Sequence, residues 1–145
     1  MPAADSDTAE LSALLQRALI LVVERNPVVQ RLERYFLEHA GHTVEFASDG
    51  QKALERARQL KPSIVVTEIM VPALDGLSLC REIKTNAETA HARVLIFSHL
   101  HAEDRAREVG ADAFLLKPFT EEILIQTVAN LITPPKAKAE ETPDD

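Results

Sequence analysis

Residues 63–76 read Ser-Ile-Val-Val-Thr-Glu-Ile-Met-Val-Pro-Ala-Leu-Asp-Gly, an apolar run that meets a single acid, Glu68, and then a turn. A short, uniformly apolar run is typical of a strand that is covered on both faces of a parallel sheet. Proline, aspartate and glycine in the following residues indicate a loop. Glu68 is therefore predicted at the carboxyl end of a buried strand, the edge where open α/β sheets carry their functional residues.

Four more apolar runs alternate with amphipathic stretches, and they lie at residues 19–23, 43–46, 94–97 and 114–116. Parallel neighbouring strands need crossover helices between them. The alternation therefore predicts an α/β fold, a doubly wound three-layer sandwich whose five-stranded parallel sheet has helices on both faces. Three of the helices are predicted to begin at a capping residue, namely Asn26, Asp49 and Thr120.

The faces of two helices bear on the later argument. In the helix after Asn26, helical spacing predicts an inner face made of Val29, Leu32, Phe36 and Ala40. In the last helix, Ile123-Leu124-Ile125 are three apolar residues in succession, so they cannot all point inward.

The chain of 145 residues and 16.0 kDa has the length of one domain with a full core. We expect that domain over 18–132. Residues 1–17 are expected to form a disordered extension or a short helix. Residues 133–145 are rich in proline and charge and are expected to be a disordered tail.

Composition argues against several classes of function. The net charge of −7 disfavours sequence-independent binding to nucleic acid, which needs a basic surface. No apolar run is long enough to cross a bilayer and the N-terminus lacks a signal-peptide pattern, so a cytoplasmic protein without membrane contact is expected. Cys80 is the only cysteine, which excludes an internal disulfide and a cysteine-based zinc cluster.

Two motifs together resemble a known family. Met70-x-Pro72-x-x-Asp75-Gly76 follows Glu68, and Val-Gly-Ala-Asp-Ala-Phe-Leu-Leu-Lys-Pro-Phe ends in the pair Lys117-Pro118. In this order they resemble the acceptor loop and the lysine loop of the CheY-like response-regulator receiver domain of two-component signalling. The resemblance covers roughly residues 18–132 and implies a flavodoxin-like fold of five βα units.

The resemblance also implies a set of site residues. In the family, two acids after the first strand and an acceptor Asp hold a magnesium ion while a phosphoryl group is transferred to the Asp. Here the acid pair falls on Glu24 and Arg25, and the acceptor position falls on Glu68. The phosphoryl-contacting hydroxyl falls on Ser98, the lysine on Lys117 and the aromatic switch position on Phe114. The last three match in type; Arg25 and Glu68 depart from the family pattern.

Arg25 should weaken metal binding, because a hard divalent cation prefers several anionic oxygens. A guanidinium about 5 Å from such an ion costs on the order of several kcal/mol at an effective dielectric constant of about 20. We expect Arg25 to form an ion pair with Glu24 or Glu68 in the place of the metal, and the alternative is that Arg25 swings into solvent. No metal or other cofactor is therefore expected, and a weak Mg²⁺ site at Glu24 and Glu68 is the remaining alternative.

Glu68 places its carboxylate about 1.5 Å further from the main chain than Asp would. Attack on a phosphodonor needs closer alignment than that, so ordinary phosphorylation should be lost. The longer side chain is expected to reach toward Lys117 and Ser98. Two interpretations stay open: Glu68 imitates part of the phosphorylated state, or it is an inert residue held by a salt bridge.

The leading hypothesis is a stand-alone, degenerate receiver domain that is not an enzyme and acts by binding a signalling protein, a histidine kinase or a downstream regulator. The expected contact surface, which could also form a homodimer, consists of the helix over 102–109, the strand 114–116 and the last helix. One alternative is a functional receiver phosphorylated by a histidine kinase at Glu68 or a nearby residue such as Thr67. Another is a flavin- or nucleotide-binding enzyme, which residues 24–27 argue against because they lack a phosphate-cradling loop.

Overall fold

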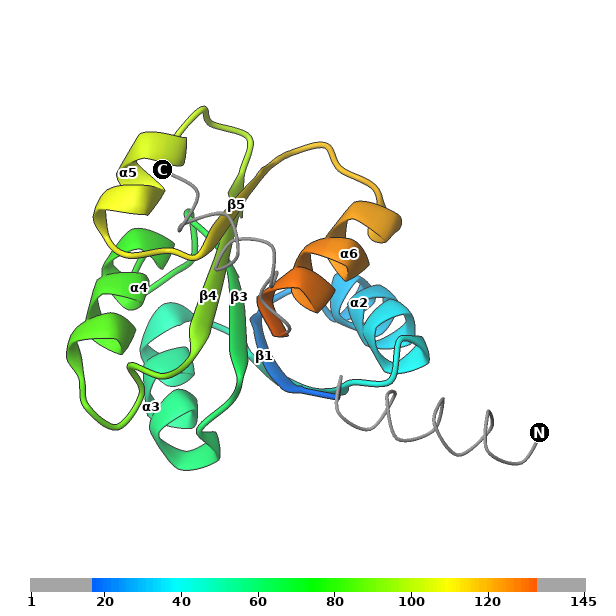
Figure 1. The fold of residues 1–145 in the computed structure, drawn as a ribbon, viewed down its shortest axis with the longest axis horizontal. Coiled ribbons are helices and arrows are strands. Elements are labelled where there is room, and N and C mark those ends of the chain that lie inside the picture. Colours follow the sequence, from blue (N-terminus) through cyan, green and yellow to red (C-terminus); the bar gives the residue numbers. More distant parts are fainter. Residues whose placement is uncertain (1–16, 133–145) are drawn as a thin grey trace, which may run out of the picture.

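Ten elements alternate regularly along the chain (Figure 1). The computed structural model describes residues 17–132. In chain order the elements are β1 (Leu19–Val23), α2 (Pro27–His39), β2 (Thr43–Ala47), α3 (Gly50–Leu60), β3 (Ile64–Glu68), α4 (Gly76–Thr85), β4 (Arg93–Ser98), α5 (Glu103–Glu108), β5 (Ala113–Leu116) and α6 (Glu121–Ile132). The predicted fold class is confirmed. Except for Arg17, the extension and the tail predicted from the sequence lie outside the described residues.

The five strands form one parallel sheet in the order β2-β1-β3-β4-β5. The order reverses between β1 and β3, which is the point where such sheets open a crevice at their carboxyl edge. Val23 of β1 lies opposite Thr67 of β3, and Glu68 lies opposite Phe97 of β4. Glu68 and the residues that follow Val23 are thereby brought to the same edge.

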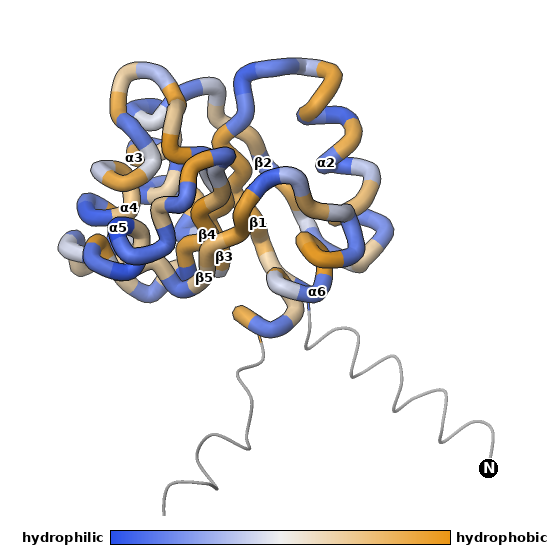
Figure 2. The backbone as a smooth tube through the Cα atoms, turned by 90° about the horizontal axis from the view of Figure 1, so that it is seen from above, coloured by the Kyte–Doolittle hydropathy of each residue, from blue (hydrophilic) through white to orange (hydrophobic). Residues whose placement is uncertain are grey.

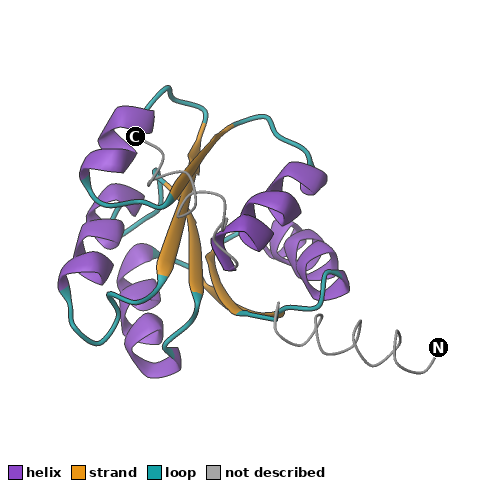
Figure 3. Cartoon of the chain, in the orientation of Figure 1, coloured by secondary structure: helices purple, strands orange, loops and turns teal. Residues whose placement is uncertain are grey.

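The sheet lies between two layers of helices, with α3, α4 and α5 on one face and α2 and α6 on the other (Figures 1 and 3). Alternate residues of a strand point to opposite faces. Leu21 and Val23 accordingly pack with the α3–α5 layer, whereas Ile20 and Val22 pack with α2 and α6. Figure 2 shows the hydrophobic strands at the centre of the molecule. No helix within residues 17–132 is long and apolar enough to span a membrane.

Side-chain caps fix where the helices begin. Asn26 Oδ1 accepts a hydrogen bond from the main-chain N–H of Val28 at 2.8 Å, and Asp49 Oδ1 accepts one from Lys52 at 2.8 Å. Thr120 Oγ1 accepts from Ile123 N–H at 3.2 Å. The three predicted caps are confirmed, and each is worth about 1 kcal/mol.

The predicted inner face of α2 is partly wrong. Leu32 is 52% exposed and Ala40 is exposed, whereas Leu37, at 1%, is the fully buried residue of this helix. Glu33, which is not among the predicted inner residues, is half-buried. A charged residue at an inward position breaks the apolar periodicity, so the predicted inner face is rotated about the helix axis from the observed one.

A half-buried carboxylate ties α4 to the strands β4 and β5. Asp112 Oδ2 lies 2.8 Å from Lys84 Nζ and accepts the main-chain N–H of Val94 at 2.8 Å, while Arg93 lies 3.5 Å from Oδ1. Removing the carboxylate leaves the ammonium and the N–H without their partner, and such groups are costly to leave unpaired.

We expect Asp112→Ala to lower the free energy of unfolding by about 2 kcal/mol, as measured by urea denaturation. Asp104→Ala is the matched control, because Asp104 forms an ion pair with Arg107 on the surface of α5 with 91% of its side chain exposed. The control should change stability by less than about 0.5 kcal/mol. Equal losses in the two variants would contradict a structural role for Asp112.

Candidate functional site

Four of the predicted site residues stand at the carboxyl edge of the sheet. Glu24 follows β1, Glu68 ends β3, Ser98 ends β4 and Lys117 follows β5. A pocket of about 620 Å³ opens there, and its lining includes Glu24, Arg25 and Glu68 but neither Ser98 nor Lys117. The structure therefore gathers the acid-pair and acceptor positions in one pocket, whereas the lysine and the hydroxyl do not line it.

Lys117 is the nearest cation to Glu68. Its Nζ lies 3.9 Å from Glu68 Oε1, and both side chains are about one-quarter to one-third exposed. An ion pair with this distance and this solvent exposure contributes little to stability. The same Nζ lies 4.8 Å from the ring centroid of Phe97, and the Lys117 main-chain N–H donates to the Ser98 carbonyl at 2.8 Å. Lys117 is thus held beside Glu68 by its main chain and by an aromatic face.

Ser98 is buried, and its hydroxyl oxygen accepts the N–H of Leu100 at 3.0 Å. Within residues 17–132, no hydrogen bond joins this hydroxyl to Glu68. The expected reach of Glu68 is therefore half correct, since the carboxylate approaches Lys117 and does not contact Ser98. The hydroxyl is occupied by the turn that follows β4.

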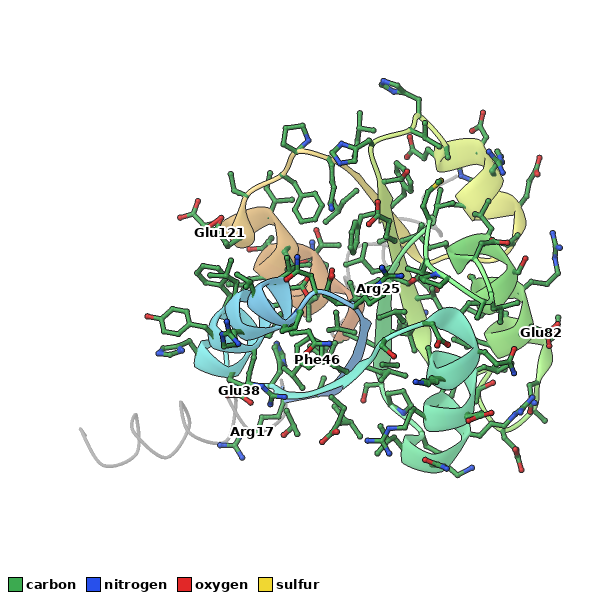
Figure 4. The ribbon with its side chains drawn as sticks, turned by 180° about the vertical axis from the view of Figure 1, so that it is seen from behind. Arg17, Arg25, Glu38, Phe46, Glu82 and Glu121 are labelled. Atoms are coloured by element: carbon green, nitrogen blue, oxygen red, sulfur yellow. The ribbon has the colours of Figure 1, made fainter. Side chains whose placement is uncertain are left out.

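The ion pair predicted for Arg25 is wrong, and the structure agrees with the alternative in which its side chain is exposed to solvent. Within the described residues the Arg25 guanidinium makes no ion pair or hydrogen bond, and the residue is exposed at the sheet edge between α2 and the α3–α4 side (Figure 4). Glu24 instead turns its carboxylate to the main-chain N–H of Asn26, at 2.9 Å. Both charges keep favourable surroundings in this way, Glu24 at the start of α2 and Arg25 in water.

The loop after Glu68 is held by two close approaches of main chain. The N–H of Gly76 donates to the Ile69 carbonyl at 2.8 Å, and the N–H of Gly50 donates to the Pro72 carbonyl at 3.0 Å. A Cβ at Gly76 would collide with the carbonyl oxygen of Glu68, and one at Gly50 would collide with that of Leu74. Glycine is required at both positions for this reason, and the main chain of Glu68 is fixed by its surroundings.

Two other residues that the sequence analysis singled out, Thr67 and Phe114, make structural contacts. Thr67, named as an alternative acceptor, is fully buried, and its hydroxyl donates to the Glu68 carbonyl at 2.8 Å. Phe114, at the switch position, lies within β5 and packs half-buried against the core on the α3–α5 side. Among residues 17–132, no group of three or more histidine, cysteine, aspartate or glutamate side chains is placed to hold a metal ion.

Sequence reasoning missed Glu33, which lines a second groove of about 510 Å³ between α2 and α6 together with Glu24 and Lys117. Its Oε1 is buried and has no hydrogen-bond partner in the described part of the chain. Burial raises the pKa of Glu33 from 4.5 to about 7; the charge of Glu24 adds to the rise and that of Lys117 opposes it. The signal in the sequence that could have identified Glu33 is a charged residue at a helical position that faces inward.

Sequence reasoning also missed Arg105 of α5, which lines the first pocket together with residues at the ends of β1 and β3. Helical spacing marks its neighbour Ala106 as inward, and Ala106 is buried. Nothing in the local sequence pattern connects Arg105 with Arg25, which lies 80 positions earlier. Only the order of the strands in the sheet brings α5 and the end of β1 to one edge.

Comparison with known proteins agrees with this geometry. The family description "Response regulator receiver domain" matches residues 20–129. The chain is 35% identical over 126 residues to the response regulator MprA of Mycobacterium ulcerans and 33% identical over 116 residues to the transcriptional regulator RpaA of Synechocystis. These matches cover 86% and 78% of this chain but only 54% and 48% of the relatives, so the chain spans about half of their length.

Solved structures agree as well. The receiver domain of a signal transduction histidine kinase from Syntrophus aciditrophicus has a TM-score of 0.75 at 27% identity, covering 82% of this chain and 92% of that one. The receiver domain of a sensor histidine kinase from Pseudomonas aeruginosa, crystallised with a magnesium ion in its active-site cleft, has a TM-score of 0.71 at 26% identity, covering 79% and 97%. This chain belongs to the response regulator receiver domain family, the CheY-like signalling modules of two-component systems.

Proposed function

We propose that this receiver domain is an atypical, stand-alone one, which works in the cytoplasm by binding a signalling protein and does not accept a phosphoryl group in the usual way. The observation that carries the proposal is the position of Lys117, whose ammonium lies 3.9 Å from the carboxylate of Glu68 itself. In the family this lysine serves an incoming phosphoryl group. Here the longer acid already brings a negative charge to it.

The composition of the pocket supports weak metal binding. Glu24 is engaged with the Asn26 N–H, and Asp75 caps α4 through the Ser78 N–H at 2.9 Å. Arg25 adds a positive charge to the same pocket. A divalent ion that needs several anionic oxygens would have to displace these contacts and tolerate the guanidinium. These residues do not fit a tightly held Mg²⁺ ion, and no step of the proposed function depends on one.

The surface formed by α5, β5 and α6 is proposed as the partner-binding face. Ile123 on α6 is 46% exposed, Leu116 on β5 is 38% exposed, and Leu124 is buried, so the successive apolar residues of α6 divide between core and surface as expected. Exposed apolar side chains on these elements suit contact with a protein. A histidine kinase, a downstream regulator or a second copy of the domain would use this face.

The test is incubation with a small phosphodonor and Mg²⁺, followed by intact-mass measurement. We expect no gain of a phosphoryl group by the natural chain, and a gain by the double variant Arg25→Asp/Glu68→Asp, which shows that the donor is active. The alternative function, phosphorylation at Glu68 or a neighbour, predicts a magnesium-dependent gain by the natural chain. Such a gain, abolished in Glu68→Gln, would establish the alternative.

A further inference from the structure

We propose that α2 pairs with α2 of a second copy of this chain in an antiparallel arrangement, so that two copies form a symmetric dimer through the outer side of this helix. The surface that makes the contact, the α2 stripe, consists of Val28, Leu32, Tyr35 and His39. The inference goes beyond the proposed function, because the α2 stripe is a different surface from the face formed by α5, β5 and α6. A chain could use both surfaces at once.

The α2 stripe is the exposed side of a helix that lies at the margin of the molecule (Figures 1 and 2). Val28, Leu32 and Tyr35 are each more than half exposed, and His39 is exposed as well, whereas Leu37 on the inner side is buried. Among residues 17–132, seven large hydrophobic side chains are exposed, and three of them lie on this one helix. Scattered exposed apolar residues need no partner, but a row of them on one element is typical of a contact surface.

The spacing of the α2 stripe indicates what kind of surface covers it. Its residues are separated by four, three and four positions, which is the alternation of the a and d positions of a coiled coil. A row with this spacing stays on one side of a helix and fits a second helix laid nearly along it. Tyr35 is already fixed by ring contacts with Phe36 and His39, at 5.4 and 4.1 Å between centroids, so little side-chain freedom is lost on binding.

The residues beside the stripe favour an antiparallel copy of the same helix. With Leu32 at an a position, Arg31 and Glu38 take g positions on one flank, and Val29 and Phe36 take e positions on the other. In an antiparallel pair g residues face g residues, so Arg31 of each copy meets Glu38 of the other, twice by symmetry. The other flank brings Val29 against Phe36, and both of these apolar side chains are still partly exposed in the single chain.

A parallel pair of the same helices lacks this complementarity. There a g residue faces an e residue of the other helix, which sets Arg31 against Phe36 and leaves Glu38 without a counterpart, because α2 ends at His39. Self-repulsion does not prevent the contact, since α2 carries two arginines and two glutamates and the net charge of −7 therefore lies elsewhere. Charge complementarity thus selects a second copy of this helix, in the antiparallel direction.

A hollow beside the stripe gives room for the charged side chains of the second copy. It measures about 460 Å³, and its lining residues all come from α2, namely Arg31, Arg34, Tyr35, Glu38 and His39. Glu38 already lies 3.0 Å from Arg34 of its own helix, so in the dimer its carboxylate would stand between two guanidinium groups. Ion pairs in such an open position set the orientation of a complex more than its affinity.

The first experiment is sedimentation equilibrium of the full chain at concentrations up to about 1 mM. A contact confined to one helix of 13 residues is small for a stable interface, so we expect a dimer with a dissociation constant on the order of 100 µM. Leu32→Asp should weaken the dimer about tenfold or more, because it places a charge in the apolar stripe. The matched control Leu100→Asp, at a leucine of similar exposure after β4, should stay within about twofold.

The second experiment tests the orientation by charge reversal. Arg31→Glu and Glu38→Arg should each dimerise about tenfold more weakly than the natural chain, because each variant sets like charges opposite one another twice. An equimolar mixture of the two variants should form a heterodimer, since every reversed charge then faces its opposite again. Circular dichroism of each variant checks that α2 stays folded. A parallel pair does not predict recovery on mixing.

Three outcomes would overturn the inference. A natural chain that stays monomeric at the highest concentration makes no such contact, and this includes the case in which a helix of a different protein covers the stripe. Dissociation by Ile123→Asp but not by Leu32→Asp would place self-association on the face formed by α5, β5 and α6. Charge variants that stay monomeric after mixing, although each is folded, would exclude the antiparallel arrangement.

Discussion

The double variant Arg25→Asp/Glu68→Asp should bind Mg²⁺ about 100-fold more tightly than the natural chain, whereas Glu68→Asp alone should gain little. The factor corresponds to about 3 kcal/mol. It comes from replacing a cation by an anion a few ångströms from the metal, where one unit charge is worth several kcal/mol against a divalent ion before screening by water. Isothermal titration calorimetry with magnesium chloride measures both variants directly.

Glu68→Asp alone is expected to gain little affinity for Mg²⁺, and the reason is electrostatic. Shortening Glu68 moves one carboxylate about 1.5 Å but leaves the number of negative charges in the pocket unchanged. Arg25 still lines the pocket, and Glu24 still turns to the Asn26 N–H. The metal would therefore meet one freely available acid and one guanidinium, which is a poor site for a cation that prefers several anionic oxygens.

The matched control for the charge change is Arg58→Asp combined with Glu68→Asp, because Arg58 is an exposed arginine on α3 that does not line the pocket. This pair should bind Mg²⁺ no better than Glu68→Asp. Tight binding by the single variant Glu68→Asp would contradict the role assigned to Arg25. It would show that the guanidinium swings far enough into solvent to leave the metal undisturbed.

The fold followed from the sequence because its local signals agree with one another. The short apolar runs became the five strands, and Asn26, Asp49 and Thr120 cap helices as predicted. Once strands are parallel and joined by helices, their carboxyl ends must share an edge. The neighbourhood of Glu24, Glu68, Ser98 and Lys117 was therefore predictable from the order of elements alone.

The contacts within the site were less predictable, because several partners compete for each charged side chain. The sequence indicated that Arg25 would have two acids, Glu24 and Glu68, as neighbours. In the structure the Asn26 N–H donates a hydrogen bond to the Glu24 carboxylate, and Lys117 lies beside Glu68. Differences of about 1 kcal/mol decide such choices. The inner face of α2 differs from the predicted one because Glu33 occupies an inward position where apolar residues are expected.

Glu33→Gln should make the domain more stable above pH 7 by about 3 kcal/mol, the free energy that corresponds to a pKa raised from 4.5 to about 7. The buried Oε1 of Glu33 has no partner among the described residues, so the ionised carboxylate is expensive to keep there. Glutamine has nearly the same shape and no charge. The value is an upper figure, because water that reaches the carboxylate reduces the cost of ionisation.

The sign of the pH dependence follows from the raised pKa. Below about pH 4.5 Glu33 is protonated in both the folded and the unfolded chain, so its full contribution to stability is present there. As pH rises from 4.5 to about 7, the unfolded chain loses the proton first, and the free energy of unfolding falls. Above pH 7 the contribution is lost. Urea denaturation at a series of pH values, compared between the natural chain and Glu33→Gln, should give a difference that grows over this range.

A second buried group, His42, makes the free energy of unfolding depend on pH in the opposite direction. The difference in stability between the natural chain and Glu33→Gln must therefore be measured. Burial lowers the pKa of His42 below 6.5, so the unfolded chain takes up the proton first and stability falls as pH drops below that value. This effect is common to both proteins and cancels in the comparison. Glu55→Gln, at an exposed glutamate of α3, is the matched control and should give a nearly flat difference. A flat difference for Glu33→Gln as well would mean that water reaches the Glu33 carboxylate and that it is not a buried acid.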